Sequence, residues 1–330
     1  MAVTNIHPGF RRMFAPGRLT VGMLFPIEAY KGDVPLMQRQ VELAQSAERL
    51  GFAALWFRDV PLRDPDFGDV GQIYDPWVYL GFILAQTRDI ALATGSIVLP
   101  LRHPLHIAKA AASVDRLSGG RLVMGIASGD RPAEYPAFGV EFATRGERFR
   151  DTLRYFRAAT EAEFPIVETP LGRMDGLDLL PKPSAGRIPV LVTGHSQQEL
   201  PWIAEHADGW LYYPRSISRQ EQSIKDWRAQ TQRYWPGVFK PFAQSLYVDL
   251  TDDPNAAPEP IHLGFKMGRN LLIDLLRQLR EVGVNHVAIN LKYSTRPAAE
   301  ALEEIGREVL PLFPANDIAQ GAAAGCASSS

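Results

Sequence analysis

The clearest candidate for ligand chemistry is the run Thr193-Gly194-His195-Ser196, which closes a short apolar segment at 188–193. Glycine lets the backbone approach a ligand closely, and the free amide groups of a helix start attract an anion such as phosphate. Ser196 and Glu199 have the spacing of a capping box, which predicts that a helix begins at Ser196. The run is therefore either a phosphate loop or only a well-capped helix start.

Two other segments place small residues where a flat ligand could approach the backbone. Ser128-Gly129 and Arg131 follow another apolar segment, so that a hydroxyl, free amides and a cation meet in one turn. Thr94-Gly95-Ser96 lies inside an apolar run, and glycine in a strand interior marks a bulge or a close approach. The structural alternatives are a tight turn with a surface arginine and packing relief inside a crowded core.

Histidine and aromatic residues give weaker indications. His103 and His106 have a spacing that places two imidazoles on one helical face. Because no Cys or His cluster supplies the remaining ligands, we expect no metal site. Aromatic residues near the ends of apolar segments either line a substrate pocket or belong to the core. The pocket candidates are Phe25, Trp56, Trp77 and Tyr212.

The elements that must position these residues alternate between short apolar segments and longer amphipathic ones. The apolar segments predict eight strands, at 19–26, 53–58, 90–99, 121–127, 188–193, 208–213, 243–250 and 284–291. A helical pattern follows each strand, with caps such as Gly51 and Asp75-Pro76. This succession predicts an α/β fold, a (β/α)8 TIM barrel with its site at the carboxyl ends of the strands. The alternative is an open doubly wound sheet, but no strand is followed by G-x-G-x-x-G.

The chain is expected to form one domain at 19–314, with insertions at 165–187 and 251–266. An extension at 1–18 precedes this domain, and a disordered tail at 315–330 follows it.

The composition bounds the class of protein. Among 330 residues, 35 are basic and 37 acidic. This balance argues against a nucleic-acid-binding protein and against a polybasic protein that binds membrane surfaces. The only cysteine is Cys326, and no apolar run approaches about 18 residues. We therefore expect a cytoplasmic protein without disulfides, signal peptide or membrane span.

Two stretches of the sequence indicate a protein family in addition to strands and helices. They are Tyr74-Asp75-Pro76-Trp77 with TGSIVLPLRHPLHIAKAAASVDRLSGGRLVMGIASGDRPAEYPAFGV at 94–140, and LLPKPSAGRIPVLVTGHSQQELPWIAEHADGW at 179–210. Both resemble the bacterial luciferase-like family of flavin-dependent oxidoreductases, and most closely its subgroup of luciferase-type oxidoreductases. The resemblance implies an eight-stranded barrel that uses reduced FMN, supplied by a partner reductase, or less often the deazaflavin F420.

The resemblance also implies a role for each matching residue. Thr94, Gly95 and Ser96 match the strand that packs against the flavin ring, where relatives can hold a non-proline cis peptide. In this sequence that peptide is expected near Gly95-Ser96. Ser128 and Gly129 match a turn that contacts the cofactor, and Gly194, His195 and Ser196 match its phosphate loop.

One position departs from the family pattern. The histidine that many relatives carry after the second strand is Val60 in this sequence, next to Asp59. We therefore take Asp59, Arg102 and His103 as catalytic candidates, because they are ionisable groups at the carboxyl ends of strands two and three. His103 is the preferred acid or base, Arg102 the partner of an anionic group, and Asp59 an orienting residue.

These observations predict an FMN-dependent monooxygenase or reductase that acts on a small organic substrate. The resemblance further implies a homodimer, as in many relatives. An F420-dependent reductase is the alternative within the family. A flavin-free barrel lyase or isomerase that binds a sugar phosphate, and a non-catalytic flavin carrier, are alternatives from other classes.

Overall fold

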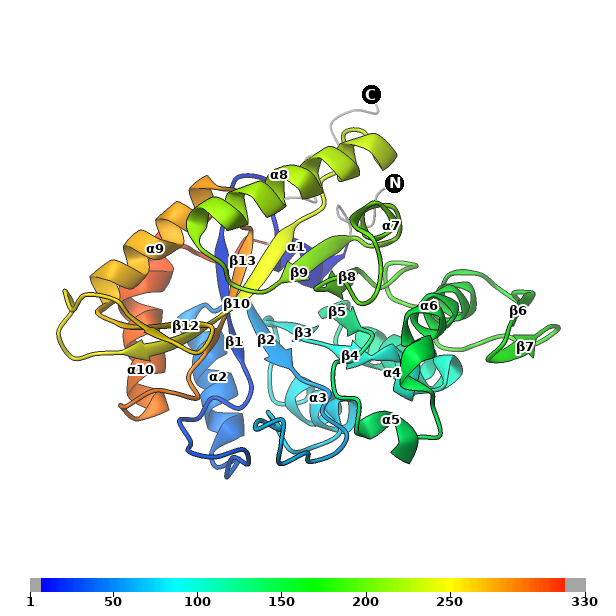
Figure 1. Cartoon of the computed structure of the whole chain (residues 1–330), viewed down its shortest axis with the longest axis horizontal. Coiled ribbons are helices and arrows are strands. Elements are labelled where there is room, and N and C mark those ends of the chain that lie inside the picture. Colours follow the sequence, from blue (N-terminus) through cyan, green and yellow to red (C-terminus); the bar gives the residue numbers. More distant parts are fainter. Residues whose placement is uncertain (1–6, 318–330) are drawn as a thin grey trace.

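The computed structural model describes residues 7–317, and its centre is a closed barrel of parallel strands (Figure 1). Neighbouring strands pair in chain order, and the ring closes where β13 pairs with both β10 and β1. The barrel strands are β1 (Thr20–Leu24), β2 (Ala54–Phe57), β3 (Ala91–Thr94), β5 (Leu122–Ala127), β8 (Val190–Thr193), β9 (Gly209–Tyr212), β10 (Phe242–Leu250) and β13 (His286–Asn290). Each overlaps the segment predicted for it, so the (β/α)8 TIM barrel is confirmed.

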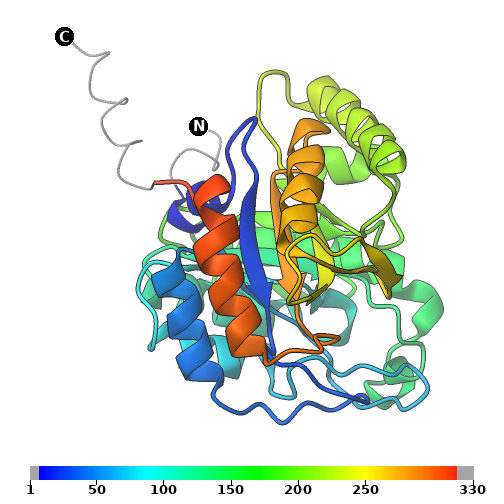
Figure 2. The ribbon, with the colours of Figure 1, turned by 90° about the vertical axis from the view of Figure 1, so that its left-hand side faces the viewer.

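Helices surround the barrel, and α2 and α10 lie side by side on its outside (Figures 1 and 2). The helices around the barrel are α2 (Gln40–Leu50), α3 (Pro76–Leu84), α4 (Pro104–Leu117), α5 (Glu134–Ala137), α6 (Arg145–Glu161), α7 (Leu200–His206), α8 (Ile217–Tyr234), α9 (Arg269–Glu281) and α10 (Ala298–Glu304). The predicted caps are confirmed, because Gly51 ends α2 in a left-handed conformation and the Asp75 carboxylate accepts the first amides of α3. Within residues 7–317, every helix is too short or too polar to cross a bilayer.

The barrel strands are apolar on both faces, which explains their nearly continuous hydrophobic pattern. In β2, Ala54 and Trp56 belong to the cluster inside the barrel, whereas Leu55 and Phe57 pack in the layer beneath the helices. The indole N–H of Trp56 donates to Nε2 of His286 at 2.9 Å. Burial lowers the pKa of His286 to about 3, so the imidazole inside the barrel is neutral.

A short helix, α1 (Pro8–Met13), closes the amino-terminal end of the barrel. Its side chains Phe10 and Met13, with Phe14 behind them, are buried in the same cluster as Trp56. Phe10, Met13 and Phe14, which lie in the predicted extension at 1–18, therefore contribute to the barrel core.

The two ends of the described chain meet at α1. The amide groups of Asn316 donate to the carbonyl oxygens of Arg11 and Arg12 at 3.1 and 3.0 Å. The start predicted for the disordered tail, residue 315, is therefore too early in the chain, because these bonds anchor Asn316. Residues 318–330, with Cys326, and residues 1–6 lie outside the described part of the chain.

Both predicted insertions contain antiparallel hairpins. The first holds β6 (Val167–Thr169) and β7 (Gly172–Met174), and the second holds β11 (Glu259–Ile261) and β12 (Gly264–Met267). Strand β12 also pairs in parallel with the last residues of β10, so the second insertion extends the barrel sheet. Strands of three or four residues are too short to show a readable period in the sequence.

The predicted third strand at 90–99 is divided in two. β3 ends at Thr94, the Gly95-Ser96 peptide bond is cis as the resemblance suggests, and β4 (Ile97–Val98) continues along β5. A 3-10 turn at Leu99–Leu101 then leads into α4. The division places Gly95 and Ser96 at the carboxyl end of the barrel.

Candidate active site

Three hydroxyl side chains and the main chain of Ser128 meet at the carboxyl ends of three neighbouring strands. Ser96 follows β3, Ser128 follows β5, and Thr193 and Ser196 lie at the end of β8. The hydroxyl of Ser96 hydrogen-bonds to that of Thr193. Ser196 Oγ donates to the Thr193 carbonyl at 2.7 Å and accepts the Ser128 amide at 3.3 Å. The structure thus brings together the three segments that the sequence assigns to cofactor binding.

The loop after β8 differs from the capping box that its spacing predicts. Gly194, Ser196 and Gln197 have positive φ values of 55°, 48° and 61°. Helix α7 begins only at Leu200, and its N-cap residue Glu199 makes no side-chain cap bond. The predicted capping box is wrong, because the left-handed Ser196 turns its hydroxyl back to Thr193. A main chain with successive turns of this kind forms a concave surface that suits an anion.

Helix α6 presents basic and amide groups to this loop. Arg150 Nη1 donates to Oε1 of Gln198 at 2.9 Å, and Gln198 Nε2 donates to the carbonyl of Gly146 at 2.9 Å. On the other side, the hydroxyl of Tyr212 lies 3.4 Å from Nε2 of His195. Arg150 contacts a neutral amide here, so its positive charge adds to the attraction of the loop for an anion.

The predicted catalytic residues Asp59 and Arg102 form an ion pair in which the carboxylate is fully buried and the guanidinium is partly exposed. Arg102 donates from Nε and Nη2 to the two Asp59 oxygens, at 3.1 and 2.8 Å, and its Nη2 also reaches Asp75 at 2.9 Å. Burial alone would lower the pKa of Arg102, but these carboxylates raise it above its ordinary value. Because two carboxylates already hold it, Arg102 is not available as the predicted partner of a substrate anion.

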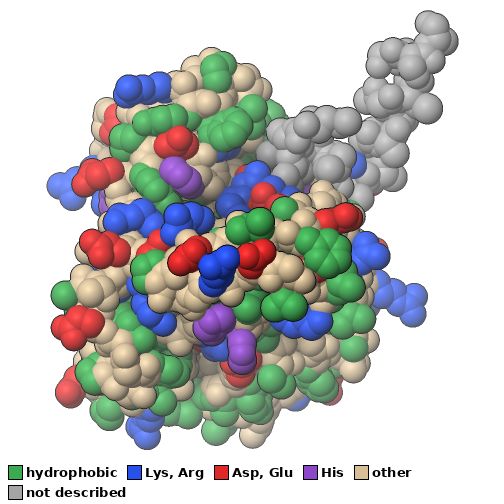
Figure 3. Space-filling model, turned by 90° about the vertical axis from the view of Figure 1, so that its right-hand side faces the viewer, with side chains coloured by type: hydrophobic (Ala, Val, Ile, Leu, Met, Phe, Trp, Pro, Cys, Tyr) green, Lys and Arg blue, Asp and Glu red, His purple; other side chains and the backbone are tan. Residues whose placement is uncertain are grey.

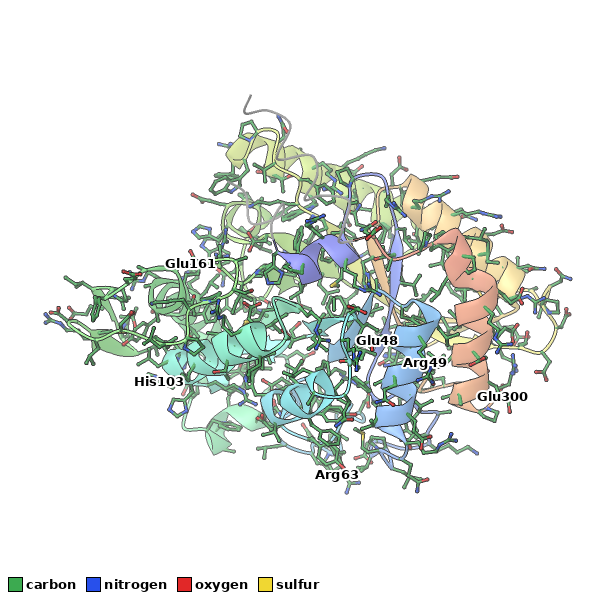
Figure 4. All side chains as sticks on the ribbon, turned by 180° about the vertical axis from the view of Figure 1, so that it is seen from behind. Glu48, Arg49, Arg63, His103, Glu161 and Glu300 are labelled. Atoms are coloured by element: carbon green, nitrogen blue, oxygen red, sulfur yellow. The ribbon has the colours of Figure 1, made fainter. Side chains whose placement is uncertain are left out.

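His103, the third predicted catalytic residue, is the N-cap of α4. It lies exposed at the start of that helix (Figure 4), and its Nδ1 accepts the Leu105 amide at 3.2 Å. The ring centroids of His103 and His106 are 5.8 Å apart. A pocket of about 440 Å³ is lined by Asp59, Arg102, His103 and the predicted aromatic residue Trp77.

Three of the four predicted pocket aromatics lie elsewhere. Tyr212 is buried beside His195 and does not line this pocket. Phe25 is fully buried between Phe57 and Tyr79, in the layer between barrel and helices. Trp56 is buried inside the barrel, directly beneath Gly95, so a Cβ added at that glycine would lie 3.2 Å from the indole. The alternation of strand faces places both side chains in the core, and neither lines the pocket.

The sequence gives no direct indication of a charged cluster at the barrel mouth. Asp69 lies on the long loop between β2 and α3, and three groups converge on its carboxylate. Arg58 Nη1 is 2.7 Å from Oδ2, and the Tyr30 hydroxyl donates to Oδ1 at 2.8 Å. Lys292 Nζ lies 3.3 Å from Oδ1. Burial opposes the charge of Asp69, but Arg58 and these hydrogen bonds hold its pKa well below the ordinary value.

Part of this cluster could be found in the sequence. Arg58 ends the predicted strand at 53–58, and Lys292 directly follows the predicted strand at 284–291, so both belong to the expected edge. Asp69 carries no such signal, because its loop has no period. A cavity of about 1000 Å³ opens beside the cluster and is lined by Tyr30, Lys292 and Tyr293.

Comparison with known families decides where this barrel belongs. The family of luciferase-like monooxygenases matches residues 19–308. The chain belongs to this family. An uncharacterised protein of Mycobacterium tuberculosis (strain ATCC 25618 / H37Rv) is 36% identical over 194 residues, which are 54% of this chain and 68% of the relative.

Solved structures share the luciferase-like barrel at low sequence identity. The oxygenating constituent of 3,6-diketocamphane monooxygenase from Pseudomonas putida, in complex with FMN, has a TM-score of 0.70 and 15% identity, and covers 89% of this chain and 98% of its own. An F420-dependent secondary alcohol dehydrogenase with an F420-acetone adduct has a TM-score of 0.71 and 15% identity, with 90% and 98% covered. These similarities show the fold.

Val60 stands where the resemblance to the family leads us to expect a histidine. The side chain lines the pocket of about 440 Å³, next to Asp59. His103 and His106 line the same pocket from α4. The imidazoles that this pocket contains therefore come from a helix, and not from the end of β2.

Proposed function

We propose that this luciferase-like protein is a flavin-dependent monooxygenase that binds reduced FMN at the hydroxyl cluster and acts on a small organic substrate. The observation that carries the proposal is the convergence of Ser96, Ser128 and Ser196 beside the cis Gly95-Ser96 peptide. FMN supplies the electrons and the oxygen chemistry when it is bound. The solved relative in complex with FMN supports this choice of cofactor.

The residues present fit a flavin mononucleotide. A Cβ at Gly95 would lie 3.2 Å from the Trp56 indole, so the glycine packs its main chain directly on that ring. We place the flavin ring on the opposite side of the cis Gly95-Ser96 peptide. The left-handed turns at Gly194 and Ser196 expose a concave main chain, and Arg150 adds positive charge beside it. We assign the ring to Gly95 and the phosphate to the loop 194–198.

The ionisable residues divide into a positioning pair and a proton-transfer group. Asp59 Oδ2 accepts the amide of Val98 at 3.0 Å, while Arg102 holds the carboxylate from the other side. The pair thereby fixes β4 directly after the cis peptide. In our proposal His103 moves the proton through Nε2, because its Nδ1 accepts the Leu105 amide.

The first experiment compares the two flavins. The purified protein is mixed with FMN or F420, oxidised and reduced, and quenching of tryptophan fluorescence is followed. We expect FMN to quench strongly, because Trp56 lies beneath the assigned ring. Binding of F420 in place of FMN would favour an F420-dependent reductase, which the F420-dependent structural relative also supports. Failure of every form to bind would contradict the proposal.

A substitution tests the placement of the phosphate. Ser196→Ala should weaken the binding of FMN more than that of riboflavin, because only FMN carries a phosphate. Ser223→Ala, on the exposed part of α8, serves as the matched control and should leave both affinities unchanged. An equal loss for FMN and riboflavin would show that the phosphate does not bind at this loop.

The proposed partners are a separate flavin reductase and a second copy of the chain. Helix α3 contains no charged residue, yet Val78 and Phe82 on it are 71% and 53% exposed. By contrast, acidic and basic side chains are mixed on the face that carries α6 and the β6–β7 hairpin (Figure 3). We assign the dimer interface to the exposed side of α3, because apolar surfaces of this kind mark contacts between proteins.

A further inference from the structure

The charged cluster at the barrel mouth contains more positive than negative groups. Arg58, Arg131 and Lys292 follow three different barrel strands and converge on Asp69. Arg58 and Lys292 contact its carboxylate, whereas Arg131 Nη2 donates to its main-chain carbonyl. Three cations thus surround one aspartate, and two of them contact its carboxylate.

Arg131 is the member of the cluster whose bonding is incomplete. Its side chain is part of a residue only 4% exposed, and the Phe67 ring lies 4.1 Å from the guanidinium. Among the described residues, Nη1 of Arg131 has no hydrogen-bond partner. A buried charged donor without a partner costs free energy, so it is normally paired.

A second buried arginine shows what a structural role looks like in this protein. Arg121 is 6% exposed, and its guanidinium donates to the carbonyls of Ser118, Ile90, Leu84 and Thr87 and to the Thr87 hydroxyl. Neutral oxygens therefore satisfy Arg121 completely. Arg131 lacks such a shell, so its Nη1 can still donate to a further acceptor.

The acidic groups around Arg131 do not replace that acceptor. Asp130 is exposed, and Glu134 accepts the Leu62 amide at 3.4 Å. Burial raises the pKa of Glu134. Asp59 is held by Arg102. Among the described residues, none of these carboxylates forms an ion pair with Arg131.

The space next to the cluster suits an aromatic or other apolar body. Lys292 and Tyr30 line the cavity of about 1000 Å³. Tyr293 lines it too, with its ring 5.2 Å from that of Tyr247. A ligand there would have the Lys292 ammonium at one end and the Tyr30 and Tyr293 rings along its side. Arg58 lies outside the cavity lining, on the other oxygen of the Asp69 carboxylate that Lys292 contacts.

We infer that Arg58, Arg131 and Lys292 bind the anionic group of the substrate, a carboxylate on an aromatic or similarly apolar body. The Asp69 carboxylate occupies the place of that anion in the ligand-free protein and is displaced when the substrate binds. This inference rests on the proposed function, because it names the substrate class of the flavin enzyme.

The test uses sodium benzoate as the probe and neutral benzamide as its uncharged counterpart. Isothermal titration of the full-length protein should show benzoate binding about tenfold more tightly than benzamide. Arg131→Gln should lose about tenfold in benzoate affinity with benzamide unchanged, because a charge-assisted bond is removed. Asp69→Asn should gain in benzoate affinity, because the competing carboxylate is gone.

Arg63→Gln is the matched control. Arg63 lines the same cavity, but its guanidinium is already paired with Asp33 at 2.7 and 3.1 Å. Its substitution should leave benzoate affinity unchanged. If Arg131→Gln does not fold, Lys292→Gln must show the same loss, and a Lys292→Gln protein with unchanged benzoate affinity overturns the inference.

Flavin titrations distinguish the substrate anion from the FMN phosphate. Arg131→Gln should bind FMN and riboflavin as the unsubstituted protein does. A loss for FMN alone would assign the cluster to the cofactor phosphate and overturn the inference. Equal affinity for benzoate and benzamide would also overturn it, even where FMN binds. The benzoate titrations are made without flavin, so a failure of FMN and F420 to bind contradicts only the proposed function.

Discussion

At the scale of single residues, Asp59 and Arg102 bind each other, and their charged groups are therefore already paired. The Asp59 side chain is fully buried, and Arg102 and the Val98 amide satisfy its oxygens. A carboxylate in such a place is stable as long as its partner remains. As ionisable residues at strand ends, both are predicted to be catalytic. Their mutual ion pair and the bond to the Val98 amide favour a positioning role instead.

Arg102→Met should therefore destabilise the protein strongly. The substitution leaves Asp59 buried without its cation, which costs about 3 kcal/mol of unfolding free energy. Urea unfolding measures this loss. Arg39→Met is the control, because Arg39 and Glu42 form an exposed pair whose contribution is about 0.5 kcal/mol. Similar losses for the two variants would contradict a structural role for the Asp59–Arg102 pair.

At the scale of elements, His103 at the start of α4 has two roles: it caps the helix, and in our proposal it transfers a proton. His103 accepts the Leu105 amide, and Pro104 occupies the first helical position. An imidazole that caps through Nδ1 keeps its orientation toward the pocket. The two roles can be separated by a side chain that caps but does not titrate.

His103→Ala should lose about 1 kcal/mol of stability together with activity, because the cap is removed. His103→Asn should recover the stability, since its amide oxygen can cap, but should remain inactive. Thermal unfolding and turnover with reduced FMN are the two measurements. An active His103→Asn enzyme would show that His103 transfers no proton.

Local chemistry explains which elements the sequence predicts well. Asp75-Pro76 predicts its helix start correctly, because a capping carboxylate and a fixed proline φ act within three residues. Ser196 and Glu199 have an equally good spacing, but the left-handed φ of Ser196 depends on Thr193 and the neighbouring strands. Spacing alone cannot encode a backbone angle that tertiary contacts set.

The same reasoning separates the predictable and unpredictable parts of the site. Ser96, Ser128 and Ser196 follow strands, and strand order alone brings them together. Asp69 lies in a loop without a period, and its partners Arg58 and Lys292 come from opposite ends of the chain. Phe25 could not be assigned to core or pocket, because an aromatic residue at a strand end is compatible with both.

At the scale of the whole molecule, the barrel encloses a polar contact in an apolar interior. The neutral His286 accepts the Trp56 indole N–H and donates from Nδ1 to Thr20 Oγ1 at 2.7 Å. The Thr20 hydroxyl in turn donates to the Met13 carbonyl at 2.6 Å. The chain of bonds joins α1 to three strands and is complete only while His286 stays uncharged.

This arrangement predicts a specific dependence of stability on pH. His286 has a folded pKa of about 3 against an ordinary value of 6.5. Between these values the unfolded chain binds a proton that the folded chain does not, so stability is lost as the pH falls through this range. The slope approaches about 1.4 kcal/mol per pH unit.

Urea unfolding at several pH values between 7 and 4 tests this prediction. His286→Gln should be less stable at pH 7 but should lack that part of the pH dependence. His106→Gln, at an exposed position on α4, should keep the slope of the unsubstituted protein. Equal slopes for all three proteins would show that His286 does not cause the effect.

The apolar surface of α3 predicts the behaviour of the molecule in solution. Phe82→Lys should convert a homodimer into a monomer, because a charge is placed in the proposed contact. Light scattering after gel filtration measures the mass. Ile166→Lys, at another exposed apolar position, should leave the dimer intact. A monomeric unsubstituted protein would contradict the proposed interface.

The position of α1 shows that the start of the family match and the start of the folded domain are different residues. The family match begins at residue 19, whereas Phe10 and Met13 fill the floor of the barrel. A chain trimmed to the match would let water reach Trp56 and His286 from below. The residues that match the family, 19–308, are therefore fewer than the residues that must fold as one unit, because α1 belongs to the core.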